Sequence, residues 1–163
     1  MVAGGHRQHR DDSIETSSPT VSITSVFLVA IIAAYNRWGI VTMDITGAYL
    51  NAPLHDPVYM RLDPYLSNIL CEISKSYQPY VNQRGEIVVR LRRALYGLIQ
   101  SSRLWYNHLK DILTSYGFVM NNEDRCVFKL VREKSVMIIC LSEFSVFFLE
   151  ISNEAHLSFT ALS

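Results

Sequence analysis

An aspartate interrupts an apolar, β-branched segment that has the length of a strand. Asp44 lies in residues 40–46, whose other members are mostly isoleucine, valine, threonine and methionine. A carboxylate inside a mostly buried strand is costly unless it is paired or bound to a metal ion. Asp44 is therefore expected either to pair with another group or to bind a metal ion. The alternative is an aspartate that caps the turn at Gly47.

A basic segment with interleaved aromatic residues is the second chemical feature. Residues 84–110 hold six basic side chains against one acidic side chain. Such a segment can follow a phosphate backbone while its rings stack on bases. A solvated strand edge beside core aromatics is the alternative. The basic residues are Arg84, Arg90, Arg92, Arg93, Arg103 and Lys110, and the aromatic ones are Tyr96, Trp105 and Tyr106.

Composition narrows the class of protein. With 163 residues, 49% hydrophobic and 18% charged, the chain can bury a core and suits one modest domain or a piece of a larger one. Its formal net charge is zero, which argues against a global field that recruits nucleic acid or anionic membrane. Cys71, Cys126 and Cys140 are widely separated, which argues against a zinc site or a disulfide scaffold and suits a reducing compartment.

Two apolar runs, residues 21–34 and 136–149, are shorter than the roughly 20 residues that a membrane span needs. The first residues lack the apolar stretch of a signal peptide. We therefore expect an intracellular, cytoplasmic chain without a membrane partner.

Local patterns predict an alternation of helices and strands. Gly39 and Gly117 are expected to end the two helices. The predicted elements are a loop or edge over residues 1–18, a helix over 20–36, strands over 40–46 and 58–62, a long connection over 63–86, a strand over 87–91, a helix over 101–116, and a hairpin of 126–131 with 135–141.

Two motifs, MDITGAYLNA at residues 43–52 and LYGLIQSSRLWY at residues 95–106, resemble the reverse transcriptase of copia-type LTR retrotransposons. Residues 43–52, MDITGAYLNA, and the later VYM at 58–60 are similar to the family pattern MDVKTAFLNG…VYM. Residues 95–106, LYGLIQSSRLWY, are similar to LYGLKQxxRxWY. Further similarity, including residues 2–8, extends the resemblance over most of residues 1–141.

The resemblance implies an α+β fold, namely a partial right-hand polymerase (fingers and palm) whose antiparallel palm sheet packs on helices and is incomplete. It implies RNA-directed DNA polymerase chemistry with two Mg²⁺ ions. The partners would be an RNA or DNA template–primer, dNTPs and the rest of a Gag-Pol polyprotein, in a virus-like particle.

By the same resemblance, individual residues acquire roles. Asp44 would be the catalytic carboxylate that binds Mg²⁺, and Tyr49 would be a steric gate against a ribose 2′-hydroxyl, with a core aromatic as the alternative. Gln100 would lie near the nucleotide and template. The nucleic-acid contacts are expected from Arg90, Arg92, Arg93 and Arg103.

The sequence departs from the family where a second metal-binding motif is expected. The family has Tyr-Val-Asp-Asp directly after the stretch that corresponds to residues 136–141, whereas this chain has Ser142-Glu143-Phe144-Ser145. Glu143 supplies one carboxylate where two are needed. Residues 142–163 are therefore interpreted as a divergent tail, after a reverse-transcriptase-like segment over 1–141.

A polyprotein fragment without catalysis is the expected result. Two alternatives stay open. The first is a non-catalytic nucleic-acid-binding remnant that uses residues 84–110. The second is a pseudogene product that fails to fold because the tail replaces palm strands, which would leave the apolar residues 144–151 exposed.

Overall fold

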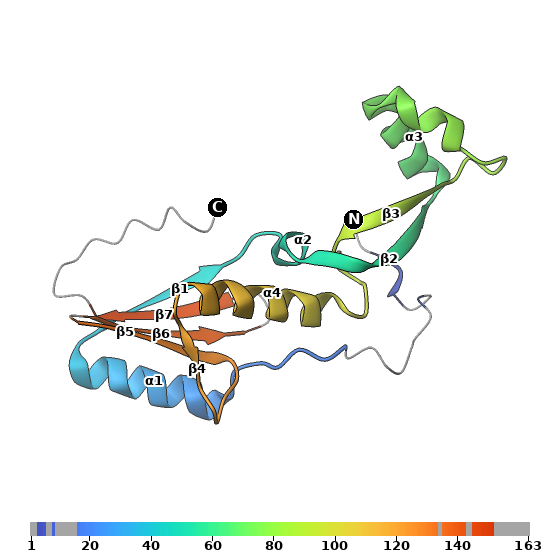
Figure 1. Cartoon of the computed structure of the whole chain (residues 1–163). Helices are drawn as coiled ribbons and strands as arrows, with labels where there is room; N and C mark the ends of the chain where they lie inside the picture. The colour runs from blue at the N-terminus through green and yellow to red at the C-terminus, as the bar shows by residue number, and fades with distance from the viewer. Residues whose placement is uncertain (1–2, 6–7, 9–15, 134, 143–144, 152–163) are drawn as a thin grey trace. The chain divides into compact units, whose positions relative to one another are not determined.

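A computed structural model describes residues 3–5, 8, 16–133, 135–142 and 145–151 (Figure 1). The chain divides into two compact units. The ribbon unit comprises Met1–Thr16 and Tyr49–Trp105, and the sheet unit comprises Ser17–Ala48 and Tyr106–Ser163. Helices combine with antiparallel strands in both units, so the α+β class expected from the sequence is observed.

The sheet unit contains a five-stranded sheet in the order β1-β7-β6-β5-β4, and every neighbouring pair is antiparallel. The β5–β6 hairpin confirms the sequence prediction, with Val127 opposite Cys140 and Arg132 opposite Ser135. The strands are β1 (Gly39–Asp44), β4 (Val119–Met120), β5 (Val127–Arg132), β6 (Ser135–Leu141) and β7 (Ser145–Ile151).

Strand β7 arises from residues that the sequence assigned to a divergent tail. It pairs with β1 on one side and with β6 on the other. Residues 145–151 therefore form a strand that is paired on both sides, while the expected exposure of the apolar side chains stays a prediction and Phe144 lies outside the described residues. The physical reason is that the sequence SVFFLEI is rich in aromatic and β-branched residue types, which favour an extended chain.

Helix α1 (Ile23–Asn36) begins after Ser22, whose Oγ accepts a hydrogen bond from the Ser25 N–H at 3.0 Å. The helix ends in a left-handed residue, as expected, but that residue is Arg37 (φ 58°) rather than Gly39. Gly39 instead begins β1. None of the described helices is both long enough and apolar enough to cross a bilayer.

Helix α4 (Ser101–Ser115) confirms the second predicted helix, and Gly117 (φ 90°) follows its end. Within the sheet unit, its residues Tyr106, Leu109 and Leu113 are buried. The Tyr106 hydroxyl donates a hydrogen bond of 2.8 Å to the Arg125 carbonyl oxygen, which ties the helix to the loop before β5.

In the ribbon unit, α2 (Ala48–Asn51) leads into an antiparallel pair, β2 (Pro53–Leu62) and β3 (Ile87–Arg93). The long connection predicted over 63–86 is not a loop, because it contains α3 (Pro64–Ile73) and the 3₁₀ helix η2 (Lys75–Tyr80). Asp63 caps α3 by accepting the Leu66 N–H at 2.8 Å, and a proline occupies the first helical turn.

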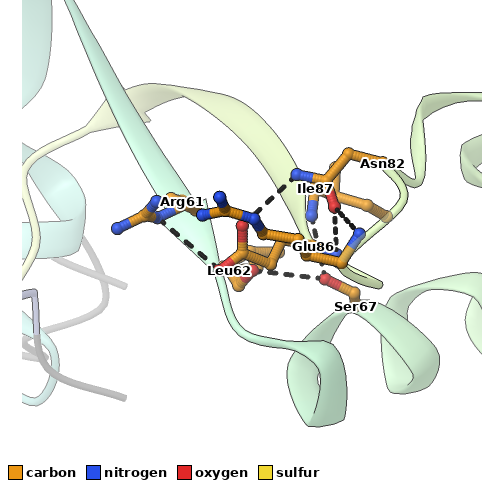
Figure 2. Close-up of polar contacts among 7 residues, drawn as sticks. Arg61, Leu62, Ser67, Asn82, Glu86 and Ile87 are labelled. Atoms are coloured by element: carbon orange, nitrogen blue, oxygen red, sulfur yellow. Dashed lines mark hydrogen bonds and ion pairs between the residues drawn. The ribbon is translucent and has the colours of Figure 1, made fainter.

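Buried Ser67 fastens α3 to the β2–β3 ribbon (Figure 2). Its Oγ accepts the Ile87 N–H at 3.0 Å and donates to the Leu62 carbonyl oxygen at 3.4 Å. At the other end of the connection, Asn82 Oδ1 accepts the N–H of Glu86 at 3.0 Å. The segment between β2 and β3 is therefore an ordered part of the ribbon unit.

All three cysteines are free thiols, as the sequence led us to expect. Cys126 and Cys140 are buried in the sheet unit. Burial raises the pKa of Cys126 to about 12 and that of Cys140 to about 11, with a smaller contribution from the nearby Asp124 carboxylate. Both side chains therefore serve as neutral packing groups.

Candidate polymerase and nucleic-acid site

Asp44 is the last residue of β1, an edge strand of the sheet. Its side chain is exposed, and so are residues 39–42 of the same strand. The expected burial of this carboxylate is therefore wrong, because the apolar run forms a sheet edge rather than a sheet centre. Support for Asp44 as a metal ligand comes from its motif alone.

Among the described residues, those around Asp44 do not make up a two-ion site. Strand pairing places Ser145 opposite Asp44, and Ser142 directly follows β6. Mg²⁺ is held in proteins chiefly by carboxylates together with water. In the part of the chain that the structure describes, no three His, Cys, Asp or Glu side chains gather closely enough to hold a metal ion, and Glu143 lies outside that part.

Tyr49 lies in α2 and is only 8% exposed. Its ring centroid lies 4.6 Å from that of Tyr96, with the rings tilted by 44°. The Ala94 N–H donates to the Ala52 carbonyl oxygen at 2.9 Å, which holds the end of this turn against the residue that follows β3. The packing agrees with the core-aromatic interpretation, and the steric-gate role stays a prediction.

Gln100 is 8% exposed and makes a side-chain hydrogen bond to a residue far away in the sequence. Its Oε1 accepts from Gln8 Nε2 at 2.7 Å, and Gln8 Oε1 accepts the Ile99 N–H at 3.3 Å. The Ala3 N–H donates to the Tyr96 carbonyl oxygen at 2.6 Å. The sequence pattern of residues 1–18 predicts only a loop or edge and gives Gln8 no role, although the family similarity at residues 2–8 is a signal for it.

Two of the predicted arginines share the exposed face of the β2–β3 ribbon. Arg90 lies opposite Tyr59, and Arg92 follows two residues later, on the same face. All three side chains are exposed. Neither arginine forms an ion pair with any other described residue, whereas Arg61, also on this face, lies 3.9 Å from Glu86. Period-two alternation along β2 was the available signal for Tyr59 and Arg61.

The other two predicted arginines lie elsewhere in the ribbon unit. Arg93 Nη1 donates to the Asn51 carbonyl oxygen at 2.7 Å, so it joins the end of β3 to α2. Arg103 lies in α4 and is half-buried. Arg93 is therefore bonded to the backbone, whereas Arg90 and Arg92 lie exposed on the ribbon face.

Comparison with known proteins identifies the family. The chain matches the family described as "Reverse transcriptase (RNA-dependent DNA polymerase)" over residues 1–149. The chain belongs to this family. The match passes Leu141 and continues into β7. No solved structure matches the chain, and the assignment of its units to fingers and palm stays a prediction.

The similar curated proteins are transposon polyproteins. Over 138 residues the chain is 35% identical to the Retrovirus-related Pol polyprotein from transposon RE1 of Arabidopsis thaliana. The matched region covers 84% of this chain and 8% of that protein. The corresponding protein from transposon RE2 of Arabidopsis thaliana is 34% identical, with 84% and 9% covered. That from transposon TNT 1-94 of Nicotiana tabacum is 27% identical over 142 residues, with 86% and 10% covered. This reverse transcriptase segment thus spans about a tenth or less of each relative.

Proposed function

We propose that this chain is a reverse transcriptase segment of a retrotransposon Pol polyprotein that has lost nucleotidyl transfer. One observation carries the proposal. Asp44, the residue that matches the family's first catalytic aspartate, pairs across the sheet with Ser145, the last residue of the segment that stands where the family has its second motif.

A two-ion mechanism would need carboxylates from both positions, because both ions would have to be held by the protein to stabilise the attacking and the leaving oxygens. Strand β6 ends at Leu141 and β7 begins at Ser145 opposite Asp44, so in the sequence residues 142–145 directly follow β6. That segment contributes two serines, a phenylalanine and a single glutamate. Hydroxyl groups are weak ligands for a hard cation compared with carboxylates, so the second ion lacks its ligands.

Primer extension and metal binding test this proposal together. We expect no extension of a DNA primer on an RNA template with Mg²⁺ or Mn²⁺. The double substitution Phe144→Asp/Ser145→Asp restores the family's aspartate pair and should tighten Mn²⁺ binding, measured by electron paramagnetic resonance, by about tenfold or more. Adding Asp44→Asn to that variant should remove the gain, whereas adding Asp111→Asn, which changes an exposed carboxylate on α4, should not.

Extension by the unmodified chain that Asp44→Asn abolishes would overturn the proposal. It would mean that Glu143 or another carboxylate completes the site. If the double variant binds Mn²⁺ equally tightly with and without Asp44→Asn, Asp44 is not a ligand of the metal site.

The exposed face of the β2–β3 ribbon favours a second function, retained binding of nucleic acid. Arg90 and Arg92 are available for phosphate, and the Tyr59 ring on the same face is 64% exposed. Arginine beside an exposed ring suits a sugar–phosphate backbone with bases that stack. The proposed ligand is an RNA or DNA template–primer.

Salt dependence tests this binding. Removing one side chain that binds a phosphate of a duplex reduces the steepness of the log–log plot of affinity against salt by about 0.9. Arg90→Gln/Arg92→Gln should therefore reduce the slope by about two, as measured by fluorescence anisotropy with an RNA–DNA template–primer. Arg132→Gln, at an exposed end of β5, is the matched control and should leave the slope unchanged. A slope that is flat for the unmodified chain would refute the binding function.

A further inference from the structure

We propose that Gln8 is a positioning residue that fixes which end of the Gln100 amide faces outward, so that Gln100 presents hydrogen-bond donors to a nucleotide. The orientation of the amide follows from contacts within the ribbon unit. The identity of the ligand rests on the proposed function.

The orientation begins at a backbone group whose polarity cannot change. The Ile99 N–H can only donate, so the atom of Gln8 that faces it at 3.3 Å must be Oε1. Gln8 Nε2 then points to Gln100 and can only donate. The atom of Gln100 that receives it at 2.7 Å must be Oε1. This sequence of contacts sets both amides without relying on an assumed amide orientation.

The consequence is a free pair of donors on Gln100. Its Nε2 makes no hydrogen bond to any other described residue. Among the described residues, no buried side-chain nitrogen or oxygen lacks a partner. The Nε2 atom therefore reaches the molecular surface, although the residue as a whole is 8% exposed.

The described residues before Gln8 lie close to the turn that contains Tyr96 and Gly97. The Ala3 N–H donates to the Tyr96 carbonyl oxygen at 2.6 Å. Gly5 lies so near Gly97, the residue after Tyr96, that a Cβ added to Gly5 would overlap the Gly97 carbonyl oxygen. The Gln8 N–H in turn donates to the Gly5 carbonyl oxygen at 3.0 Å, so the close approach and the glutamine belong to one turn.

Because the Nε2 of Gln100 faces outward, the ligand must offer a hydrogen-bond acceptor to it. This Nε2 binds an acceptor oxygen, which a nucleotide offers on its phosphates, its sugar and its base carbonyls. Two sources share this chemistry, namely a free dNTP and a template–primer. The inward Oε1 is occupied by Gln8 and is not offered to a donor.

Exchange of side-chain amide protons tests the orientation without any ligand. In the unmodified, ¹⁵N-labelled chain, the Gln8 amide protons should exchange with water about tenfold or more slowly than those of Gln100, since one of them is hydrogen-bonded and the Gln100 pair faces solvent. In Gln8→Glu, one carboxylate oxygen still accepts the Ile99 N–H, but the other can only accept. Gln100 must then turn its amide nitrogen inward, and its protons should become the slow ones.

Gln83→Glu is the matched control, because Gln83 is exposed in the same unit, and it should leave the Gln100 exchange rate unchanged. Equal exchange rates for Gln8 and Gln100 in the unmodified chain would overturn the proposal, and this measurement needs no variant to fold. An unchanged Gln100 rate in folded Gln8→Glu would overturn it as well.

Ligand titration separates this inference from the proposed function. dTTP and an RNA–DNA template–primer are added separately, and the Gln100 amide signal is followed. We expect one of them to shift the signal, with affinity about tenfold lower in Gln8→Glu. If neither ligand shifts it while the exchange pattern holds, the nucleotide ligand is wrong and the positioning by Gln8 stands. Equal affinity in Gln8→Glu would overturn the positioning role.

Discussion

Replacing Ser67 by alanine should loosen the attachment of α3 to the β2–β3 ribbon. Ser67 is fully buried in α3, and its hydroxyl is the partner of the Ile87 N–H at the first residue of β3 (Figure 2). Ser67→Ala removes that acceptor and keeps the helix. Because Ile87 is only 1% exposed, water cannot readily replace the hydroxyl.

The magnitude follows from two opposing effects. A buried N–H left without a partner lowers the free energy of unfolding by about 1–3 kcal/mol. The 3.4 Å hydrogen bond to the Leu62 carbonyl oxygen is long and adds little. Alanine is a better helix former than serine by up to about 0.5 kcal/mol, which offsets part of the loss. The net decrease should be about 1–2 kcal/mol.

This effect is measured by unfolding the protein in urea and using hydrogen exchange of peptides from α3 and β3 to detect the unfolding. Ser76→Ala is the matched control, because Ser76 is exposed and bonds to the hydroxyl of Ser74 alone, so its effect should stay within about 0.5 kcal/mol. Equal effects of Ser67→Ala and Ser76→Ala would refute the reasoning. So would a loss confined to peptides of the sheet unit.

Three other perturbations test the remaining structure. Gly5→Ala places a Cβ onto a backbone carbonyl and should destabilise the ribbon unit by about 1–3 kcal/mol in urea unfolding, whereas Gly39→Ala, where a Cβ meets open space, should have little effect. Burial raises the pKa of Cys126 to about 12 and that of Cys140 to about 11, from an ordinary 9.0, so the folded state favours the protonated thiols. The free energy of unfolding should therefore fall as pH rises above about 9 and on through these values. Cys126→Ala/Cys140→Ala should make that fall less steep. Burial raises the pKa of Asp124, but hydrogen bonds from serine hydroxyls and backbone N–H groups outweigh it and lower the pKa below 3.8, so stability should be lost as pH falls through the lowered value, and Asp124→Asn should show a weaker acid dependence.

Elements governed by local pattern were predictable from the sequence. The α4 helix and the β5–β6 hairpin follow from apolar periodicity and turn residues. Helix α3 was missed although Asp63 and Pro64 form a good helix start, because the serines, asparagines and prolines after them resemble a loop. What orders this segment is the contact of Ser67 with Ile87, 20 residues away, and no local pattern encodes such a contact.

The sequence predicted which residues belong to the candidate site, but it did not predict their exposure or their contacts. Motifs pointed to Asp44, Tyr49 and Gln100, but an apolar run looks the same at the edge and at the centre of a sheet, so the exposure of Asp44 was missed. Gln8 lies 92 residues from Gln100, and only the folded chain brings their amides together. Arg93 was predicted to contact phosphate because the sequence shows its charge. The sequence does not show its hydrogen bond to the Asn51 carbonyl oxygen.

Loss of the second catalytic motif and loss of the fold are physically separable in this chain. The departure from the family falls on residues 142–145, at the junction of β6 and β7, whereas the pairing that builds the sheet runs along both strands. Backbone hydrogen bonds in a sheet need extended residues rather than particular side chains, so serine pairs opposite Asp44 as aspartate would. Because β1 depends on β7 for its pairing, a substitution that broke β7 would release β1 and Asp44 with it. On the proposed function, the chain has therefore lost its chemistry through residues 142–145, while the strand that holds Asp44 keeps its place in the sheet.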